Sequence, residues 1–265
     1  MRHVLASRVS RCEIERRVPD ESIAELVHAG FFRMLQPKRW GGLEAHPNEF
    51  FDVVVEIASA CPSTAWVLGV VAVHAWQLAL FPAEAQSDVW KDDRDVRISS
   101  SYMPVGKVTR VDGGFRLSGK WGFSSGVDHA KWVFLGAMVP PAKEGDAPEM
   151  LTFLVPLSEC IVHDDWFVSG LRGTGSKSVE VKDAFVPAHR THRMADGFRC
   201  SSPGNAENDA EVDRATLVLK PGHVVWVSRE QRTLGRYRDW TIGEGKNPVW
   251  LAKDDQPDWD AAHPD

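Results

Sequence analysis

The stretch that most limits how this chain can fold is the apolar run WVLGVVAVHAWQLALF, which extends from Trp66 to Phe81. At about sixteen residues it is shorter than the roughly 20 that a membrane-spanning helix needs, and it carries His74 and Gln77. A helix that is apolar on every side has to be surrounded by other parts of the protein. The run therefore predicts a buried helix, and we expect no membrane-spanning segment.

The segments on both sides of this run also have helical spacing. PDESIAELVHAGFF begins at Pro19 with a cap region and then places Ile23 and Leu26 on one face. WGGL predicts a turn, after which PNEFFDVVVEIASAC resumes the helical pattern. PAEAQSDVW, which starts at Pro82, is typical of a short closing helix with proline in its first turn. Together these segments predict an N-terminal helical domain over residues 1–92.

From about Arg97 the apolar residues alternate with polar ones, as in strands, and β-branched residues become frequent. DGG at residues 112–114 is a hairpin signal between KVTRV and FRLSG. AKWVFLGAMV, EMLTFLVPL and SKSVEVKDAFVP supply further strands. The pattern predicts an antiparallel β-barrel or sandwich over residues 93–198, and so an α+β fold. Residues 199–265 are an atypical, partly irregular tail with a loop, one strand and an acidic end that we expect to be disordered.

Charge and cysteine usage exclude several classes of protein. The formal net charge of −6 argues against a nucleic-acid partner. The segment before Arg17 lacks the apolar core of a signal peptide, so we expect a cytoplasmic protein. The pair His189 and His192 in HRTH has no third ligand, and we predict no metal site. Four scattered cysteines without a CxxC pair indicate a reducing compartment, with neither a zinc site nor a disulfide framework: Cys12, Cys61, Cys160 and Cys200.

The stretch SGKWGFSSGVDHAKW, Ser118 to Trp132, combines aromatic residues with small hydroxyls. Indole and phenyl walls beside serine hydroxyls and backbone amides suit a planar heteroaromatic ring with hydrogen-bonding edges, such as an isoalloxazine. The alternative is that Trp121, Phe123 and Trp132 are core residues of the β domain. Ser124 and Ser125 would then only form a turn.

A second serine cluster, SSSY, comes just before the predicted hairpin. An alternating strand would place Ser99 and Ser101 on one face and Ser100 and Tyr102 on the other. His74 on the apolar helix is either a core histidine with satisfied hydrogen bonds or a third element of the same site. The glycine-rich turn LRGTGS lacks the spacing of the known phosphate-binding motifs, so we do not interpret it as a phosphate cradle.

Five ordered segments resemble one known family: GFFRMLQPKRWGGLE, STAWVLGVVAVHAWQLALF, RISSSYMP, KWGFSSGVDHAKW and GLRGTGSKSVEVKDAFVPAHR. Over residues 18–210 the chain is similar to the oxygenase component of two-component, flavin-dependent aromatic monooxygenases, which have the acyl-CoA dehydrogenase fold. The likeness is strongest to the branch that hydroxylates secosteroid phenols and weaker to the p-hydroxyphenylacetate branch. It implies that a separate reductase supplies reduced FMN or FAD by diffusion, and that O2 hydroxylates a small phenolic or steroid-derived aromatic substrate.

The resemblance also implies roles for particular residues. Ser125 is the expected hydrogen-bonding group near the reactive edge of the flavin or the phenol oxygen, and His74 matches a position near the aromatic pocket. A phenol attacks more readily when its hydroxyl gives up a proton, so both residues are predicted to be catalytic. Seven positions match flavin-contacting residues of the family: Trp66, Ser100, Ser101, Tyr102, Phe123, Ser124 and Ser125.

The family continues after its β domain with a long C-terminal helical bundle, which completes the flavin site and forms a homotetramer. In this sequence the likeness ends near Ala210. We therefore expect a chain truncated before the bundle, with the tetramer in doubt and activity at risk. Two alternatives stay open: an acyl-CoA dehydrogenase-like flavoenzyme, and a truncated remnant that is not an enzyme.

Overall fold

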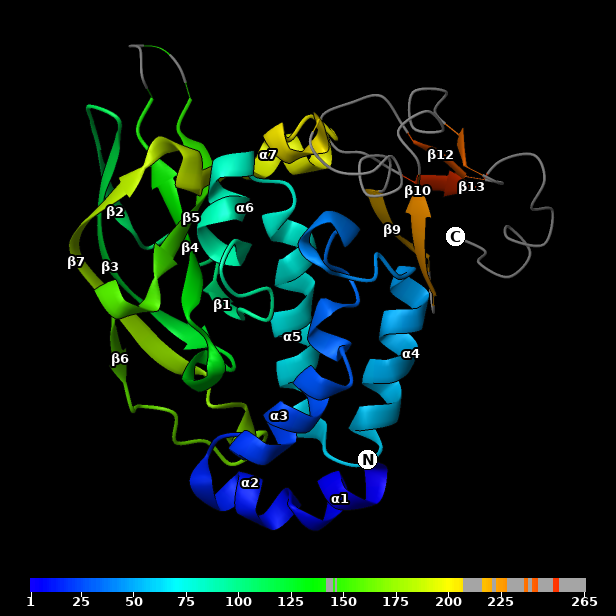
Figure 1. The fold of residues 1–265 in the computed structure, drawn as a ribbon. Helices are drawn as coiled ribbons and strands as arrows, with labels where there is room; N and C mark the ends of the chain where they lie inside the picture. Colours follow the sequence, from blue (N-terminus) through cyan, green and yellow to red (C-terminus); the bar gives the residue numbers. More distant parts are fainter. Residues whose placement is uncertain are drawn as a thin grey trace, which may run out of the picture. The chain divides into compact units, whose positions relative to one another are not determined.

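The computed structural model describes residues 1–141, 145 and 147–206, together with the backbone of five short strands between residues 216 and 252. The chain divides into two compact units, residues 1–208 and residues 209–265. In the first unit, helices form one side and two β-sheets the other (Figure 1).

Six α-helices precede the first strand in the described residues: α1 (Arg2–Ser7), α2 (Val9–Glu15), α3 (Asp20–His28), α4 (Pro47–Ala58), α5 (Pro62–Leu78) and α6 (Ala83–Trp90). Proline occupies the first turn of α4 and α5, where its missing N–H leaves no helical hydrogen bond unmade. The predicted buried helix is confirmed as α5, whose Leu68 and Leu78 are completely buried. Around it, Leu26 of α3 and Phe50 of α4 complete an apolar core.

The strands of the first unit form two four-stranded sheets, in the orders β1-β4-β5-β8 and β2-β3-β7-β6. The predicted hairpin is confirmed as the antiparallel β2–β3 pair. The strand bounds are β1 (Ile98–Ser101), β2 (Lys107–Val111), β3 (Gly114–Ser124), β4 (Trp132–Val139), β5 (Glu149–Pro156), β6 (Ile161–His163), β7 (Lys177–Pro187) and β8 (Thr191–Arg193).

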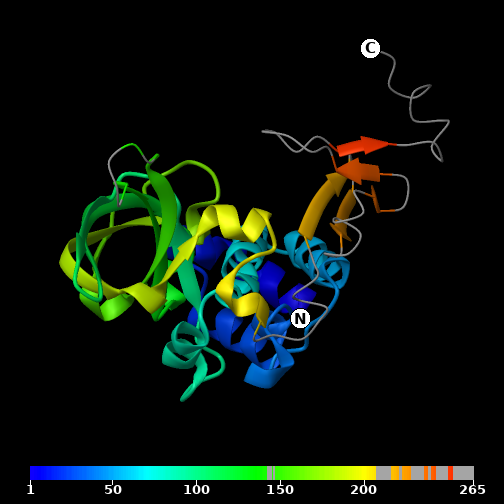
Figure 2. The same cartoon turned by 90° about the horizontal axis from the view of Figure 1, so that it is seen from above.

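One detail of the predicted β domain needs correction. β1 and β4 pair in parallel, whereas the other pairs of these two sheets are antiparallel. Parallel strands need a long connection between them. The β2–β3 hairpin provides it, because it lies between β1 and β4 in sequence and belongs to the other sheet. In the described residues no strand pairing joins the two sheets, so of the two predicted arrangements the structure has the sandwich and not the closed barrel. Figure 2 shows the strands beside the helices from above.

A second apolar cluster joins the helices to the first sheet. Leu78 and Phe81, at the end of α5 and just beyond it, are buried together with Ile98 of β1, Phe134 of β4 and Leu154 of β5. The rings of Phe81 and Phe134 stack with their centroids 5.2 Å apart. Helices and strands therefore share one core at this junction.

The two sheets are joined by the side chain of Trp121, which comes from β3. This indole is completely buried, and its N–H lies 2.9 Å from the carbonyl oxygen of Gly136 on β4. The alternative that these aromatic residues belong to the core therefore holds for Trp121, but not for Phe123, which is exposed.

The end of the first unit contains a short helix, α7 (Met194–Phe198). The second unit contains the antiparallel pair β9 (Thr216–Lys220) and β10 (His223–Val227), and a sheet of β11 (Arg236–Tyr237), β12 (Trp240–Ile242) and β13 (Trp250–Ala252). The expectation of a single strand beyond residue 199 is thus wrong. The acidic end, residues 253–265, lies outside the described residues. The divisions predicted at residues 92/93 and 198/199 stay predictions.

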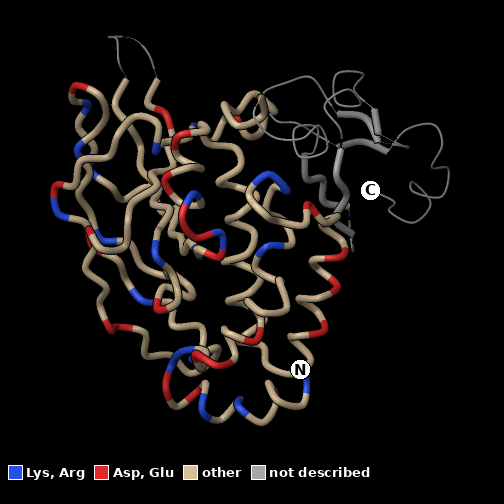
Figure 3. The backbone as a smooth tube through the Cα atoms, viewed as in Figure 1, with Lys and Arg blue, Asp and Glu red and all other residues tan. Residues whose placement is uncertain are grey.

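Charged residues of both signs are interspersed over the described part of the first unit, and Figure 3 shows no long stripe of Lys and Arg there. Among the helices that the structure describes, none has the length and apolar character to cross a membrane.

Candidate active site

The strand end that carries Phe123 has an unusual backbone. Phe123 has a φ of 61°, in the left-handed region that residues other than glycine rarely adopt. The β3–β7 register shifts between Trp121 and Ser124, so β3 bulges here. At the bulge Phe123 is 66% exposed, whereas Ser124 is completely buried. A strained backbone of this kind persists only where neighbouring contacts hold it, and such strain is frequent at functional sites.

Ser125 follows the bulge and lies in a chain of hydrogen bonds that joins three distant segments. The indole N–H of Trp66, on α5, donates to Ser125 Oγ over 3.1 Å. Ser125 Oγ is 2.7 Å from Ser176 Oγ, and Ser176 Oγ is 2.7 Å from Thr174 Oγ1. The Thr174 hydroxyl donates to the carbonyl oxygen of Leu171 over 2.9 Å.

The direction of these bonds follows from the carbonyl at the end of the chain, because a carbonyl oxygen can only accept. Thr174 gives its proton to that carbonyl and so accepts from Ser176. Ser176 has then used its own proton and accepts from Ser125. Ser125 consequently donates to Ser176, accepts from Trp66 and keeps one acceptor position open. To a bound group Ser125 therefore offers an acceptor rather than a donor.

One aromatic ring contacts Ser125, and two more pair with each other, one close to it in sequence and one in the loop before β7. Trp66 is 51% exposed although its N–H is bonded, and the Phe123 ring lies 5.8 Å from the Trp166 ring, edge to face at 76°. Exposed rings beside a polar group with an open acceptor position are typical of a ligand site. The arrangement suits a planar heteroaromatic ring that carries an N–H on its edge.

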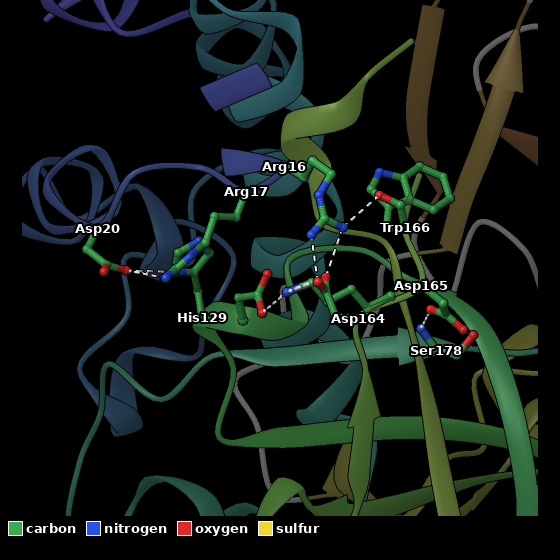
Figure 4. Close-up of polar contacts among 10 residues, drawn as sticks. Arg16, Arg17, Asp20, His129, Asp164, Asp165, Trp166 and Ser178 are labelled. Carbon is green, nitrogen blue, oxygen red and sulfur yellow. Dashed lines mark hydrogen bonds and ion pairs between the residues drawn. The ribbon is translucent and has the colours of Figure 1, made fainter. Parts of the chain in front are cut away.

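An ion-pair network attaches the loop before β7 to the N-terminal helices (Figure 4). Arg16, directly after α2, donates to both oxygens of Asp164 over 2.9 and 2.6 Å and to the Trp166 carbonyl over 3.1 Å. Lys177 Nζ lies 2.7 Å from Asp128 and 3.5 Å from Asp164. The hydrogen bond from Arg16 lowers the pKa of Asp164, which therefore stays ionised at neutral pH. These contacts hold the loop that supplies Trp166.

His74 lies where α5 meets β1. Its ring is buried, with Nδ1 2.6 Å from the carbonyl oxygen of Ile98 and the rings of Phe134 and Tyr102 at 5.6 and 6.2 Å. Because the carbonyl only accepts, Nδ1 carries the proton and Nε2 is left as an acceptor. The Tyr102 hydroxyl bonds to Gln77 of α5, and burial raises the pKa of Tyr102. His74 and Tyr102 are therefore neighbours.

The buried histidines should make the protein less stable in acid. Burial lowers the pKa of His74 to about 4, and His129 and His192 also have pKa values lowered to about 4, mainly by burial. An unfolded histidine has a pKa of about 6.5, so between about pH 6.5 and 4 the unfolded state binds more protons. The stabilisation is therefore complete above about pH 6.5 and is lost as the pH falls toward 4.

A variant isolates the share of His74 in this effect. Between about pH 7 and pH 4.5, the free energy of unfolding of the wild type should fall by about 2 kcal/mol more than that of His74→Gln. Urea unfolding at the two pH values measures both. Equal pH dependence in the two proteins would mean that His74 is not buried in the neutral form.

The predicted site residues fall into two groups. Phe123, Ser124 and Ser125 lie at the end of β3, whereas the serines of β1 lie with His74 and Tyr102 at the other location. Helix α5 connects the groups because it carries both Trp66 and His74, about 12 Å apart along its axis at 1.5 Å per residue.

The serines of β1 do not divide between a buried and an exposed face. All four residues of this strand are buried, Ser100 and Ser101 among them. The hydroxyls of Ser99 and Ser124 have no hydrogen-bond partner among the described residues, which is uncommon for buried polar atoms. Ser124 is thus not part of the chain of hydrogen bonds around Ser125.

The sequence analysis missed several residues of this site. Thr174 and Ser176 belong to LRGTGS, which was set aside because it matches no phosphate-binding motif, and Trp166 and Arg16 were not singled out. A signal was present, since GTGS places two small hydroxyls in one of the five segments that carry the family resemblance.

Two other places in the described residues lie apart from the candidate site. An open cleft of about 760 Å³ lies between α3 and the 3-10 turn η3 (Val127–His129), but none of the predicted site residues lines it. The pair His189 and His192 contacts Asp88 and Ser202, respectively, each over 2.9 Å. Within the described part of the chain, no three His, Cys, Asp or Glu side chains are placed to hold a metal ion.

Comparisons with known proteins identify relatives of this chain. The family described as "Acyl-CoA dehydrogenase, N-terminal domain" matches residues 1–92. The "Flavin-dependent monooxygenase, oxygenase subunit HsaA" of Rhodococcus jostii (strain RHA1) is 48% identical over 208 residues, which are 78% of this chain and 54% of that protein. The "p-hydroxyphenylacetate 3-hydroxylase, oxygenase component" of Acinetobacter baumannii is 35% identical over 201 residues, 76% of this chain and 47% of the relative.

A solved structure supports the same relationship. The crystal structure of 3-HSA hydroxylase from Rhodococcus sp. RHA1 superposes with a TM-score of 0.77 at 47% identity, over 80% of this chain and 54% of that one. The chain thus spans about half the length of the relatives that it matches. Over the part that matches, the chain is similar to the oxygenase subunits of flavin-dependent monooxygenases, and its fold is acyl-CoA dehydrogenase-like.

Proposed function

We propose that this chain binds reduced flavin beside Ser125 and is an oxygenase that hydroxylates a phenolic ring with O2. The observation that carries the proposal is the Ser125 hydroxyl, which Trp66 and Ser176 hold next to exposed aromatic rings with one acceptor position open. The names of the relatives support the reaction class. Because the chain spans about half of their length, its activity and substrate are part of the proposal.

The residues at this end of β3 fit a reduced flavin. The reduced isoalloxazine carries an N–H at N5, and Ser125 has an open acceptor position for such a donor. Trp66 and Phe123 offer apolar surfaces for the ring, and bound reduced flavin supplies the electrons that activate O2. By accepting from N5–H, Ser125 would keep that proton in place, while the aromatic rings would limit the access of water.

In the proposed reaction His74 orients the substrate. Its Nδ1–H is bonded to the Ile98 carbonyl, and burial keeps the ring neutral at pH 7. The remaining nitrogen, Nε2, can therefore only accept, which suits the O–H of a phenol. The proposed substrate is a phenolic or steroid-derived aromatic compound.

The proposal includes a partner and a location. A separate flavin reductase would supply reduced FMN or FAD by diffusion, as the likeness to an oxygenase component implies. A cytoplasmic location belongs to the proposal because free reduced flavin and unpaired thiols need a reducing environment.

The test mixes the protein with reduced FMN, or with reduced FAD, in the absence of oxygen, adds oxygenated buffer and follows the flavin absorbance. We expect oxidised flavin to appear only after a delay, because Ser125 holds the N5 proton. The Ser125→Ala variant should shorten the delay about tenfold. Loss of one hydrogen bond costs about 1.4 kcal/mol, and a change of that size in the barrier changes a rate tenfold. Ser158→Ala, at an exposed position of a turn after β5, should behave as the wild type.

Other outcomes would redirect the assignment. Reoxidation of the flavin at the rate of free flavin in the wild type would contradict the proposal and favour a remnant without activity. Bleaching of oxidised flavin by an acyl-CoA without oxygen would instead favour an acyl-CoA dehydrogenase-like enzyme.

A further inference from the structure

The open cleft between α3 and η3 has the size of a small-molecule site, at about 760 Å³. Its lining is of two kinds. Ala24 and Val27 of α3 contribute apolar groups, whereas Arg33, Arg97 and Lys131 contribute positive charge. An apolar wall with a few polar groups is typical of a ligand site, so the charges that the chain leaves unpaired decide which ligand fits.

The negative charges of the cleft are neutralised by the chain itself. Three carboxylates line it, and each forms an ion pair with a basic side chain: Asp20 with Arg17, Asp95 with Arg33, and Asp128 with Lys177. Lys131 of the lining is also paired, with Asp93 over 2.7 Å. Most of the charge in this cleft is therefore already balanced within the described residues.

Arg97, which is partly exposed, is the exception. Among the Lys and Arg side chains of the lining, it alone forms no ion pair with a described residue. Its Nε donates to the His129 carbonyl oxygen over 2.8 Å and its Nη1 to that of Asp95 over 3.2 Å, whereas Nη2 has no acceptor in the described part of the chain. Burial lowers the pKa of Arg97, although the charges of Asp93 and Asp95 oppose the shift. A carboxylate that entered the cleft would supply the missing hydrogen-bonded counter-charge.

His129 of the same lining also has an unsatisfied polar atom. Its Nδ1 lies 3.4 Å from Asp20 and 3.5 Å from a guanidinium nitrogen of Arg17, and Figure 4 shows the three side chains together. Its Nε2 is buried and has no hydrogen-bond partner among the described residues, which is uncommon for a buried polar atom. In the tautomer in which Nδ1 accepts from Arg17, Nε2 carries the proton and lacks an acceptor.

We propose that this cleft binds an organic monocarboxylate with an apolar body, whose carboxylate pairs with Arg97. A single unpaired guanidinium matches one negative charge, and its planar fork of N–H groups matches two carboxylate oxygens. A phosphate dianion suits the cleft less, because three carboxylates line it. The apolar body of the ligand packs against Ala24 and Val27. The site is separate from Ser125, and binding there needs no flavin.

The test follows arginine side chains by NMR while sodium octanoate is added to the full chain, labelled with 15N, at constant ionic strength and without flavin. The Nε–Hε signal of Arg97 is identified by its absence from Arg97→Lys. We expect this signal to shift and saturate with a Kd of about 1 mM, the scale for a ligand of about ten non-hydrogen atoms. Octan-1-ol, which lacks the charge, and inorganic phosphate, which lacks the apolar body, should each bind at least about tenfold more weakly.

A matched pair of variants leaves Arg97 in place. Ala24 is exposed on α3 and lines the cleft, so a longer polar side chain is tolerated there. Ala24→Glu should bind octanoate about fivefold more weakly than Ala24→Gln, because the added carboxylate repels that of the ligand. Because glutamate and glutamine have nearly the same shape, the difference between these two variants reports charge alone.

Two further variants test the role of Arg97. Arg97→Lys keeps the charge without the planar fork and should bind octanoate about tenfold more weakly, with the Arg33 signal as the reporter. Lys107→Gln removes an exposed cation on β2, outside the cleft, and should bind as the wild type does.

Several results would overturn the proposal: no saturable shift of the Arg97 signal, equal affinities for octanoate and octan-1-ol, or equal affinities of Ala24→Glu and Ala24→Gln. Tighter binding of phosphate than of octanoate would also contradict it. The wild type and the Ala24 pair decide the question even where replacement of Arg97, which bonds to two backbone carbonyls, disturbs folding.

Discussion

The Trp121→Ala variant is expected to lose about 4 kcal/mol of unfolding free energy, within the range for large aromatic residues removed from a core. Trp121 is completely buried, and its indole N–H reaches the carbonyl oxygens of Gly136 at 2.9 Å and Met103 at 3.1 Å. Glycines at positions 106 and 119 lie against the ring, where an added Cβ would be 2.7 and 2.8 Å from it. Removal of the indole therefore leaves a cavity between the two sheets and two carbonyls without their donor.

Urea unfolding followed by circular dichroism measures this loss. Trp121→Phe is the matched variant, because it keeps an aromatic ring but has no N–H, and it should lose about 2 kcal/mol. If both variants lost the same amount, the packing of the indole would contribute nothing beyond its hydrogen bonds, which would contradict the buried position between the sheets.

The Gly173→Ala variant should be destabilised by about 2–3 kcal/mol, the range for overpacking of a core. An alanine Cβ at this position would lie 2.1 Å from Cys12 Sγ and 3.0 Å from the Ser63 Cβ, so α2, α5 or the 3-10 turn η5 (Arg172–Thr174) has to move. The same displacement would disturb Thr174, and flavin binding at Ser125 should weaken with it. Thermal unfolding and flavin titration measure the two effects.

Gly170→Ala is the control for this variant. It lies in the same loop, and a Cβ there would meet no atom within 4 Å. Its stability should stay within about 0.5 kcal/mol of the wild type. A similar loss in both variants would mean that the loop, rather than the contact with Cys12, is sensitive to any added methyl group.

Much of the fold follows from local sequence patterns. The apolar run around His74 gives a helix with no polar face, and DGG closes a hairpin, because both signals depend only on neighbouring residues. The parallel pairing of β1 with β4 could not be predicted in this way. Alternation shows that Ile98 to Ser101 form a strand, but the identity of the partner strand depends on the path of the intervening hairpin.

Local sequence patterns likewise predict only part of the candidate site. The aromatic and serine pattern at Phe123 and Ser125 was visible in one short stretch, and the family resemblance added Trp66. Ser176 and Thr174 come from a loop about fifty residues further along, and nothing near them in sequence shows that they bond to Ser125. The flavin experiment tests the predicted roles of Ser125 and His74.

The core shared by helices and sheet has a consequence for biosynthesis. Leu78 and Phe81 share a cluster with Phe134 of β4 and Leu154 of β5, so the cover of the C-terminal end of α5 is incomplete until those strands have left the ribosome. Translation proceeds from the N-terminus, and the helices emerge well before the strands that bury them. A nascent chain that ends before Leu154 therefore exposes part of an apolar helix end, and we expect such a chain to be prone to aggregation.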